Sequence, residues 1–132
     1  MWLNLYLALA GELVEAGRYD EADDVFAEFF AHPDAANESA DYLSYVAAYH
    51  VHALCRGGRA KDAVQVGLDA WSAHPWSPLA QELGDAFLAL GAPRIARRWA
   101  QTAHAMGPPG PVFMYQADEA GDTALRLTLS AA

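Results

Sequence analysis

The sequence predicts an all-α protein, a right-handed stack of three helix-turn-helix repeats that ends in a short C-terminal β-hairpin or lid. The main observation is a block that occurs three times, as GRYDEA at residues 17–22, GRAKDA at 58–63 and GAPRIA at 91–96. A block that returns every roughly 20–50 residues is typical of repeat arrays, in which each unit buries its apolar face against the next. The abundance of alanine and leucine favours helices for these units.

The composition agrees with one globular domain. The chain has 132 residues, of which 54% are hydrophobic and 19% charged, so it can bury a core. Its single cysteine, Cys55, excludes an intrachain disulfide and fits a reducing, cytoplasmic location. No run approaches the roughly 18 apolar residues that cross a membrane. No basic residue precedes Arg18, so we expect no signal peptide and no membrane partner.

The net charge of −9 is concentrated in the first half of the chain. The acids that cluster most closely are Asp20, Glu21, Asp23, Asp24 and Glu28. Because phosphate contacts need a basic stripe, this charge distribution argues against a nucleic-acid partner. We interpret the acids as a solvated helix face. The alternative is a docking patch for a basic partner, which includes the basic face of a second copy.

The first helical pair is expected on either side of Gly17. A first helix over residues 2–16 ends there, because glycine is favoured just past a helix C-terminus. Asp20 is expected to cap the second helix. That helix has an apolar stripe formed by Ala22, Val25, Phe26, Phe29 and Phe30. His32 followed by Pro33 ends it, and residues 34–39 form a polar connector that explains the longer first interval.

Four more helices follow. They are expected over about residues 40–56, 60–73, 77–90 and 93–106. Ser39 or Asn37 caps the first of these, which Gly57 and Gly58 end. Ser77 followed by Pro78 predicts a serine cap with proline in the first helical position. Pro93 opens the last helix in the same way.

The pairs share a pattern of small and large residues. In the third unit it is carried by Leu83, Gly84, Phe87, Ala96 and Pro108, and in the first by Tyr6, Leu9, Ala10, Leu13, Gly17, Tyr19, Ala22, Phe26 and Pro33. On these residues the chain resembles the tetratricopeptide repeat family. The resemblance implies one domain over residues 1–108, with units at about 3–36, 39–76 and 77–108. Small residues let paired helices approach, and large ones fill the space between units.

The middle unit departs from this pattern. It keeps Leu54, Gly58, Ala63 and Pro75. However, His50 stands where leucine is usual in the family, Val51 where a small residue is usual, and Gly67 where a large one is usual. The register of the middle unit therefore stays open at this point.

The last segment, residues 109–132, breaks the helical pattern. A stiff proline-rich hinge at 107–111 is followed by an apolar run at 112–116 and a strictly alternating run at 125–130. Period two on either side of a glycine-containing turn predicts a β-hairpin, with a short capping helix begun by Asp122 as the alternative. Either element would cover the apolar face of the last unit.

The resemblance implies a protein–protein interaction module that binds a peptide or partner protein in a concave groove. In the family, the first helix of each pair lines that groove. The corresponding positions are Asn4, Leu7, Gly11, Val14, Tyr45, Ala48, His52, Cys55, Gln81, Asp85 and Leu88. The alternative is that these residues are only solvated or covered by the tail. Members that hold a peptide carboxylate use Lys, Arg and Asn there, and only Asn4 fits, so that mode is not expected.

The sequence gives little support for catalysis, a metal or a cofactor. His32 and His74 each precede a proline at a helix end, where a cation is favourable. His52 and Cys55 lie three residues apart, but a structural zinc site needs four ligands. Nucleophile-elbow and phosphate-loop motifs are missing. We therefore expect no enzyme activity, no metal and no cofactor.

Two further functions remain open at this stage. One is a self-associating structural subunit, a homodimer that pairs through the end of the array or through the tail. The other is a small cytoplasmic chaperone for a secreted or assembling protein. Trp71, Trp76 and Trp99 are expected in the core between units, because they fall on second helices or between units.

Overall fold

The computed structural model describes residues 2–107, and this part of the chain is helical throughout apart from its connections. The elements are α1 (Trp2–Glu15), α2 (Tyr19–Ala31), the 3₁₀ turn η1 (Pro33–Asn37), α3 (Ala40–Arg56), α4 (Ala60–Ala73), α5 (Ser77–Ala89) and α6 (Pro93–Met106). The predicted helices are confirmed to within one or two residues. The predicted hairpin or capping helix at 109–132, and Pro108 before it, lie outside the described residues.

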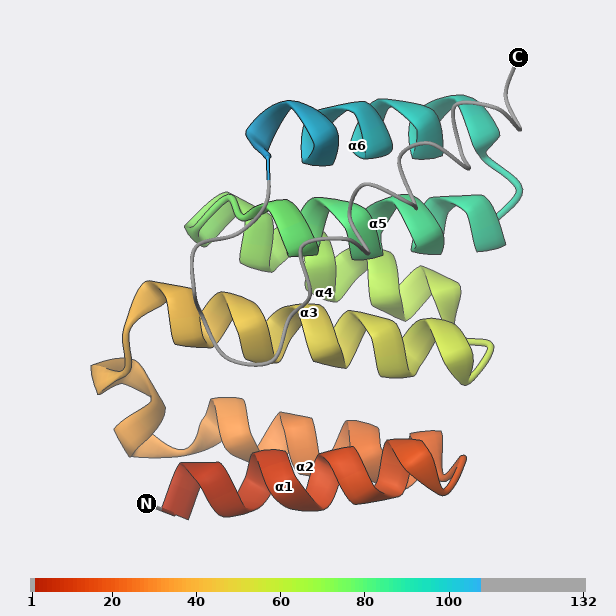
Figure 1. The fold of residues 1–132 in the computed structure, drawn as a ribbon. Helices are drawn as coiled ribbons and strands as arrows, with labels where there is room; N and C mark the ends of the chain where they lie inside the picture. The colour runs from red at the N-terminus through yellow and green to blue at the C-terminus, as the bar shows by residue number, and fades with distance from the viewer. Residues whose placement is uncertain (1, 108–132) are drawn as a thin grey trace.

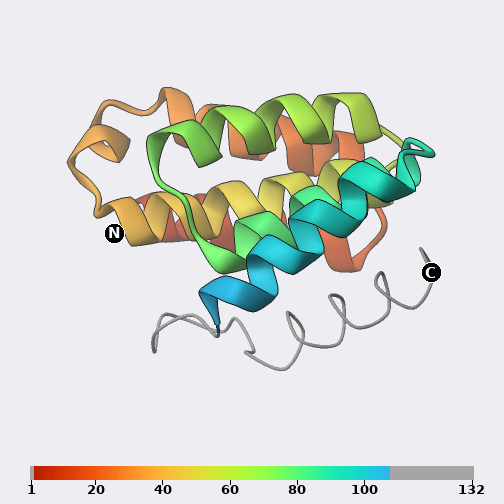
Figure 2. The same cartoon turned by 90° about the horizontal axis from the view of Figure 1, so that it is seen from above.

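The helices form three antiparallel pairs stacked in chain order (Figure 1). The pair α1 and α2 forms one end of the stack, and α6 lies at the other. In both views α1, α3 and α5 form one layer, with α2 and α4 behind them (Figure 2). The largest fully buried side chains include Phe26, Phe29, Leu54, Leu79 and Leu83. The core therefore lies between the layers and between successive pairs.

The recurring glycine makes the turn inside each pair. Gly17, Gly58 and Gly91 have φ of 74°, 77° and 78°, in the left-handed region that glycine reaches without steric cost. In each turn the next residue donates its N–H to a carbonyl five residues back, as Arg18 does to Leu13 at 2.8 Å. This bond satisfies a carbonyl that the helix end leaves open. The repeated sequence block therefore forms the same turn in each of the three helical pairs.

Two predicted caps are wrong. Asp20 lies inside the first turn of α2, and Arg18 holds the N-cap position with no side-chain hydrogen bond. Helix α5 begins at Ser77 itself, so Trp76 is its N-cap residue and no side chain caps it. Helix α2 therefore begins two residues earlier, and α5 one residue earlier, than the capping preference predicts. Ser39 does cap α3, where its Oγ accepts the N–H of Tyr42 at 3.2 Å.

The unusual residues of the middle pair compensate for one another. Gly67 is buried on α4, and a methyl group built there would lie 2.5 Å from Cδ2 of Leu83 and 3.3 Å from Cγ2 of Val51. The side chains of Val51 and Leu83 thus occupy the space that a large residue at position 67 fills in the family pattern. A larger Val51 and a smaller Gly67 exchange volumes, which keeps the packing dense.

The tryptophans behave as predicted. Trp76 is 7% exposed and its ring meets Tyr45 edge-on, with centroids 6.4 Å apart. Trp71 of α4 and Trp99 of α6 meet edge-on at 5.0 Å. Edge-to-face contacts between aromatic rings at these distances are favourable. These rings therefore join the middle pair to the third.

Candidate interaction surface

The positions predicted to line a groove lie on α1, α3 and α5, and we call them the first-helix face. On α1, Asn4 is exposed, while Leu7, Gly11 and Val14 are half-buried. The Oδ1 atom of Asn4 accepts a hydrogen bond from the hydroxyl of Tyr42 at 2.8 Å. This bond joins the first helix of the first pair to the first helix of the second.

On α3, two of the four predicted groove residues are buried and two are partly exposed. Tyr45 and Ala48 are 5% and 0% exposed, so they belong to the packed interior. His52 and Cys55 are half-buried one turn further along. Of these four residues, only His52 and Cys55 offer surface to a partner.

The α5 part continues the face past the middle pair. Gln81 is only 5% exposed, Asp85 is half-buried, and Leu88 is 38% exposed. Residues 81, 85 and 88 follow one another at four- and three-residue spacing, so they lie along one side of the helix. The structure thus gives this face a polar middle and an apolar end.

Helices α3 and α5 meet at a carboxylate that the sequence analysis did not identify. Oε2 of Glu82 lies 3.4 Å from Nδ1 of His52, and Glu82 is only 5% exposed. The hydrogen bond to this carboxylate outweighs burial and raises the pKa of His52. Burial, reinforced by the charges of Asp85 and Glu82, raises the pKa of the Cys55 thiol to about 11. The first-helix face is therefore electronegative near Cys55.

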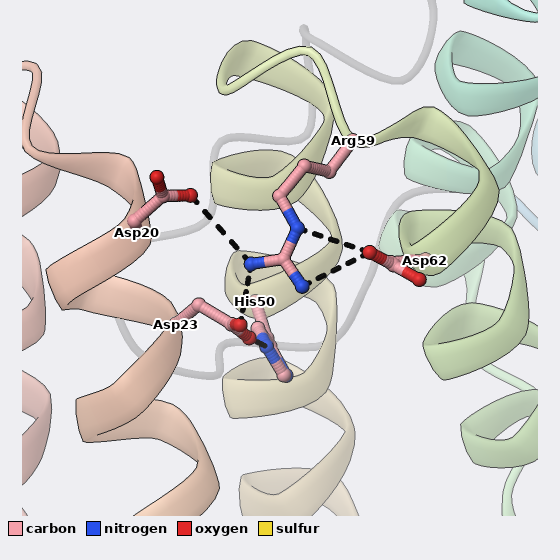
Figure 3. Close-up of polar contacts among 5 residues, drawn as sticks. All are labelled: Asp20, Asp23, His50, Arg59 and Asp62. Carbon is pink, nitrogen blue, oxygen red and sulfur yellow. Dashed lines mark hydrogen bonds and ion pairs between the residues drawn. The ribbon is translucent and has the colours of Figure 1, made fainter.

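A second polar cluster joins the first pair to the second (Figure 3). Asp23 of α2 lies between His50 and Arg59: its Oδ1 is 2.6 Å from His50 Nε2, and its Oδ2 accepts from Arg59 at 2.6 Å. Arg59 also donates to Asp62 of α4 and faces Asp20 at 3.6 Å. His50 stacks on Phe26 with ring centroids 4.8 Å apart. Three helices and the turn between α3 and α4 therefore meet at Asp23.

Burial and hydrogen bonding set the charges of this cluster. Burial outweighs the attraction of Asp23 and lowers the pKa of His50, so its ring is neutral near pH 7 and Nε2–H donates to the carboxylate. Burial opposes ionisation of Asp23, but the bonds from His50 and Arg59 outweigh it and lower that pKa. An ionised Asp23 bound to a neutral imidazole and a guanidinium is a stable structural arrangement. It explains why position 50 holds histidine instead of leucine.

His32 and His74 also have polar partners. His32 and His74 are the C-cap residues of α2 and α4, as their positions before proline suggested. Beyond that role, His74 Nε2 lies 2.9 Å from Asp41, which is 33 positions earlier in the chain. Nδ1 of His32 accepts the N–H of Asp34 at 3.1 Å and so caps η1. These partners are remote or lie in a turn, so helix-end preferences alone could not reveal them.

An apolar hollow of about 460 Å³ lies at the α1 end of the stack. It is lined by Leu5, Tyr6, Leu9 and His32. Leu5 and Leu9 are 57% and 51% exposed, more than the other large apolar residues described. A smaller hollow of about 230 Å³ lies between the first two pairs, lined by Phe30, Ala40, Leu43, Ser44, Ala47, Ala70, Ala73 and His74.

Comparison with known proteins identifies the architecture. The crystal structure of the P58(IPK) TPR domain superimposes on this chain with a TM-score of 0.66 and 18% sequence identity. The chain has the fold of a tetratricopeptide-repeat array. The match covers 98% of this chain and 34% of the P58(IPK) chain, so this protein spans about a third of that structure. No protein-family model matches the sequence, and no curated protein matches it.

Among residues 2–107, no three His, Cys, Asp or Glu side chains are grouped in a way that could hold a metal ion. None of the described helices has the length and apolar character needed to cross a membrane.

Proposed function

We propose that this chain is a protein-interaction module that binds a peptide or a partner protein along the first-helix face. The single observation that carries the proposal is the tetratricopeptide-repeat fold, in which the first helices of the pairs line a concave groove. Helical and extended peptides commonly bind in such grooves. The role is one of binding and not of catalysis, and the lone cysteine fits a reducing, cytoplasmic compartment.

Burial decides which of the predicted groove residues a partner could contact. Asn4, Leu7, Val14, His52, Cys55, Asp85 and Leu88 have surface to offer, and Gly11 lets a partner approach the backbone of α1. Tyr45, Ala48 and Gln81 are proposed to shape the floor of the groove from below, because they are almost fully buried. A charged residue at Tyr45 would therefore unfold the chain and would be a poor test.

The test uses two leucines of equal exposure. Leu88 on the first-helix face and Leu68 on α4 are each 38% exposed. The immobilised chain, with no change, with Leu88→Asp or with Leu68→Asp, is used to isolate partners from the native host. We expect the Leu88→Asp variant to lose partners that the Leu68→Asp variant keeps. Identical capture by both variants would place binding elsewhere.

A second candidate function is self-association through the α1 end of the stack. The observation that favours it is the hollow between Leu5, Leu9 and His32, together with the high exposure of both leucines. Exposed apolar patches often mark contact surfaces, and most homodimers pair through one shared patch. Sedimentation velocity over a range of concentrations tests it: Leu9→Glu should give a monomer, and Leu68→Glu should not. A chain that is already monomeric at high concentration would exclude this candidate.

A further inference from the structure

The helices at the two ends of the stack expose apolar side chains. Of the large apolar residues described, Leu5 and Leu9 of α1 are the most exposed, at 57% and 51%, and Ile95 of α6 comes next at 46%. Helices α1 and α6 lie at opposite ends of the stack (Figure 1). Solvent-exposed apolar side chains of this kind often mark contact surfaces.

The same two ends carry opposite charges. Helix α1 has two carboxylates and α2 has five, and neither helix has a basic side chain. Helix α6 has three arginines and no carboxylate. Opposite charges on two surfaces steer them together and fix their orientation, whereas like charges oppose contact. The two ends of the stack are therefore electrostatically complementary.

Carboxylates border the hollow at the α1 end. Glu12 is three residues after Leu9, and Glu28 is four residues before His32, spacings at which side chains are neighbours on one side of a helix. Both carboxylates are exposed, and within residues 2–107 neither forms an ion pair. We call the hollow, with Leu5, Leu9, Glu12 and Glu28, the α1 patch.

On α6, the exposed isoleucine lies beside two arginines. Arg94 and Arg98 are four residues apart and Ile95 is three residues before Arg98, so the three side chains are neighbours on the helix surface. Both arginines are exposed, and neither pairs with a carboxylate of the described residues. We call these three residues the α6 patch. Its arginines are open to carboxylates of another molecule.

We propose that copies of this chain associate head to tail, with the α6 patch of one copy on the α1 patch of the next. Arg94 and Arg98 pair with the carboxylates that border the hollow, and Ile95 enters the hollow itself. A cavity of about 150 Å³ is enough to bind benzene, so the hollow of about 460 Å³ has room for this side chain. The inference rests on the second candidate function, self-association through the α1 end, and specifies the surface that binds there.

Electrostatics favour this arrangement over a symmetric contact between two α1 ends. A symmetric contact would bring the carboxylates of Glu12 and Glu28 from both copies together, and like charges repel. A head-to-tail contact instead places arginines against carboxylates. It also leaves one patch of each kind free at the ends of every assembly, so growth continues past the dimer unless a ring closes.

The test mixes two variants of the full chain, each of which blocks one patch. Leu9→Glu blocks the α1 patch and Arg98→Glu blocks the α6 patch. In sedimentation velocity at low salt, each variant alone should be monomeric at concentrations where the unchanged chain associates. An equimolar mixture should form dimers and nothing larger, because the intact α6 patch of one variant binds the intact α1 patch of the other. Added salt should dissociate these dimers, since it screens exposed ion pairs.

The matched control for reversing a charge is Arg56→Glu. It replaces an exposed arginine at the end of α3 and should associate as the unchanged chain does. Circular dichroism checks that every variant is folded. If one of the two blocking variants is unfolded, Leu5→Glu or Arg94→Glu replaces it, because each blocks the same patch.

The outcomes separate this inference from both proposed functions. If Arg98→Glu associated like the unchanged chain while Leu9→Glu were monomeric, head-to-tail contact would be overturned and self-association through two α1 ends would stand. A mixture that stays monomeric would also overturn the inference. An unchanged chain that is monomeric at every concentration would overturn the inference and self-association together. The comparison of Leu88→Asp with Leu68→Asp would still decide whether the first-helix face binds a partner.

Discussion

Replacing Gly67 by alanine tests the volume exchange in the middle pair. Two effects oppose each other at this position. Alanine is the better helix former by about 1 kcal/mol. Its methyl group, however, would lie 2.5 Å from Cδ2 and 2.9 Å from Cγ of Leu83, a side chain with no exposed surface and little room to move.

The steric effect should be the larger. Forcing an extra carbon into a packed core costs about 1–3 kcal/mol, so after the gain in helix propensity we expect Gly67→Ala to lower the free energy of unfolding by about 1 kcal/mol. Gly11→Ala is the matched control. Gly11 also lies within a helix, but the nearest atom to its added methyl is the Tyr49 hydroxyl at 3.4 Å, an ordinary contact. That control should stabilise the chain by up to about 1 kcal/mol.

Urea unfolding followed by circular dichroism measures both changes, and the dependence of stability on urea should be the same in all variants. A double-mutant cycle then identifies the cause. In a Leu83→Ala background the obstructing carbons are gone, so Gly67→Ala should become neutral or stabilising. If Gly67→Ala stabilised the wild-type chain as much as Gly11→Ala does, or if its effect were unchanged in the Leu83→Ala background, the explanation by packing would be refuted.

Three other predictions concern polar groups. Burial holds the pKa of His50 below its ordinary value of 6.5, so the unfolded chain takes up this proton first and the free energy of unfolding falls as the pH drops below about 6.5. The test compares the wild type with His50→Gln. His52, whose pKa is raised, changes the free energy of unfolding with pH in the opposite direction, but it is present in both proteins and its effect cancels in the comparison. The variant should therefore lose less stability between neutral and mildly acid pH, and parallel curves would contradict this. Ser39→Ala should lower the free energy of unfolding by about 1 kcal/mol, because Ser39 Oγ caps α3. Its control is Ser72→Ala on the exposed side of α4, which should leave the free energy of unfolding nearly unchanged in the same urea assay. With a pKa of about 11, Cys55 should react with iodoacetamide at pH 8 about two orders of magnitude more slowly than in the urea-unfolded chain; similar rates would show that the thiol is not buried as described.

The helices, their turns and their order could be predicted from the sequence because each depends on neighbouring residues. A glycine at 17, 58 or 91 ends a helix through its own backbone freedom, and a proline such as Pro93 begins one for an equally local reason. The errors at Asp20 and Ser77 are local too, since a helix can begin one or two residues early when packing favours it. The tetratricopeptide resemblance added the stacking of the pairs, which the structure confirms.

Only the tertiary structure decided what the exceptions to the repeat pattern do. His50 joins Asp23 across 27 residues, and Gly67 makes room for Leu83 on another helix. Likewise, Glu82 meets His52 only because α3 and α5 pack together, whereas Tyr45 and Gln81 are buried although their helix positions predict a groove. Such contacts depend on which helix surfaces meet and at what depth, and residue spacing within one helix carries no information on that.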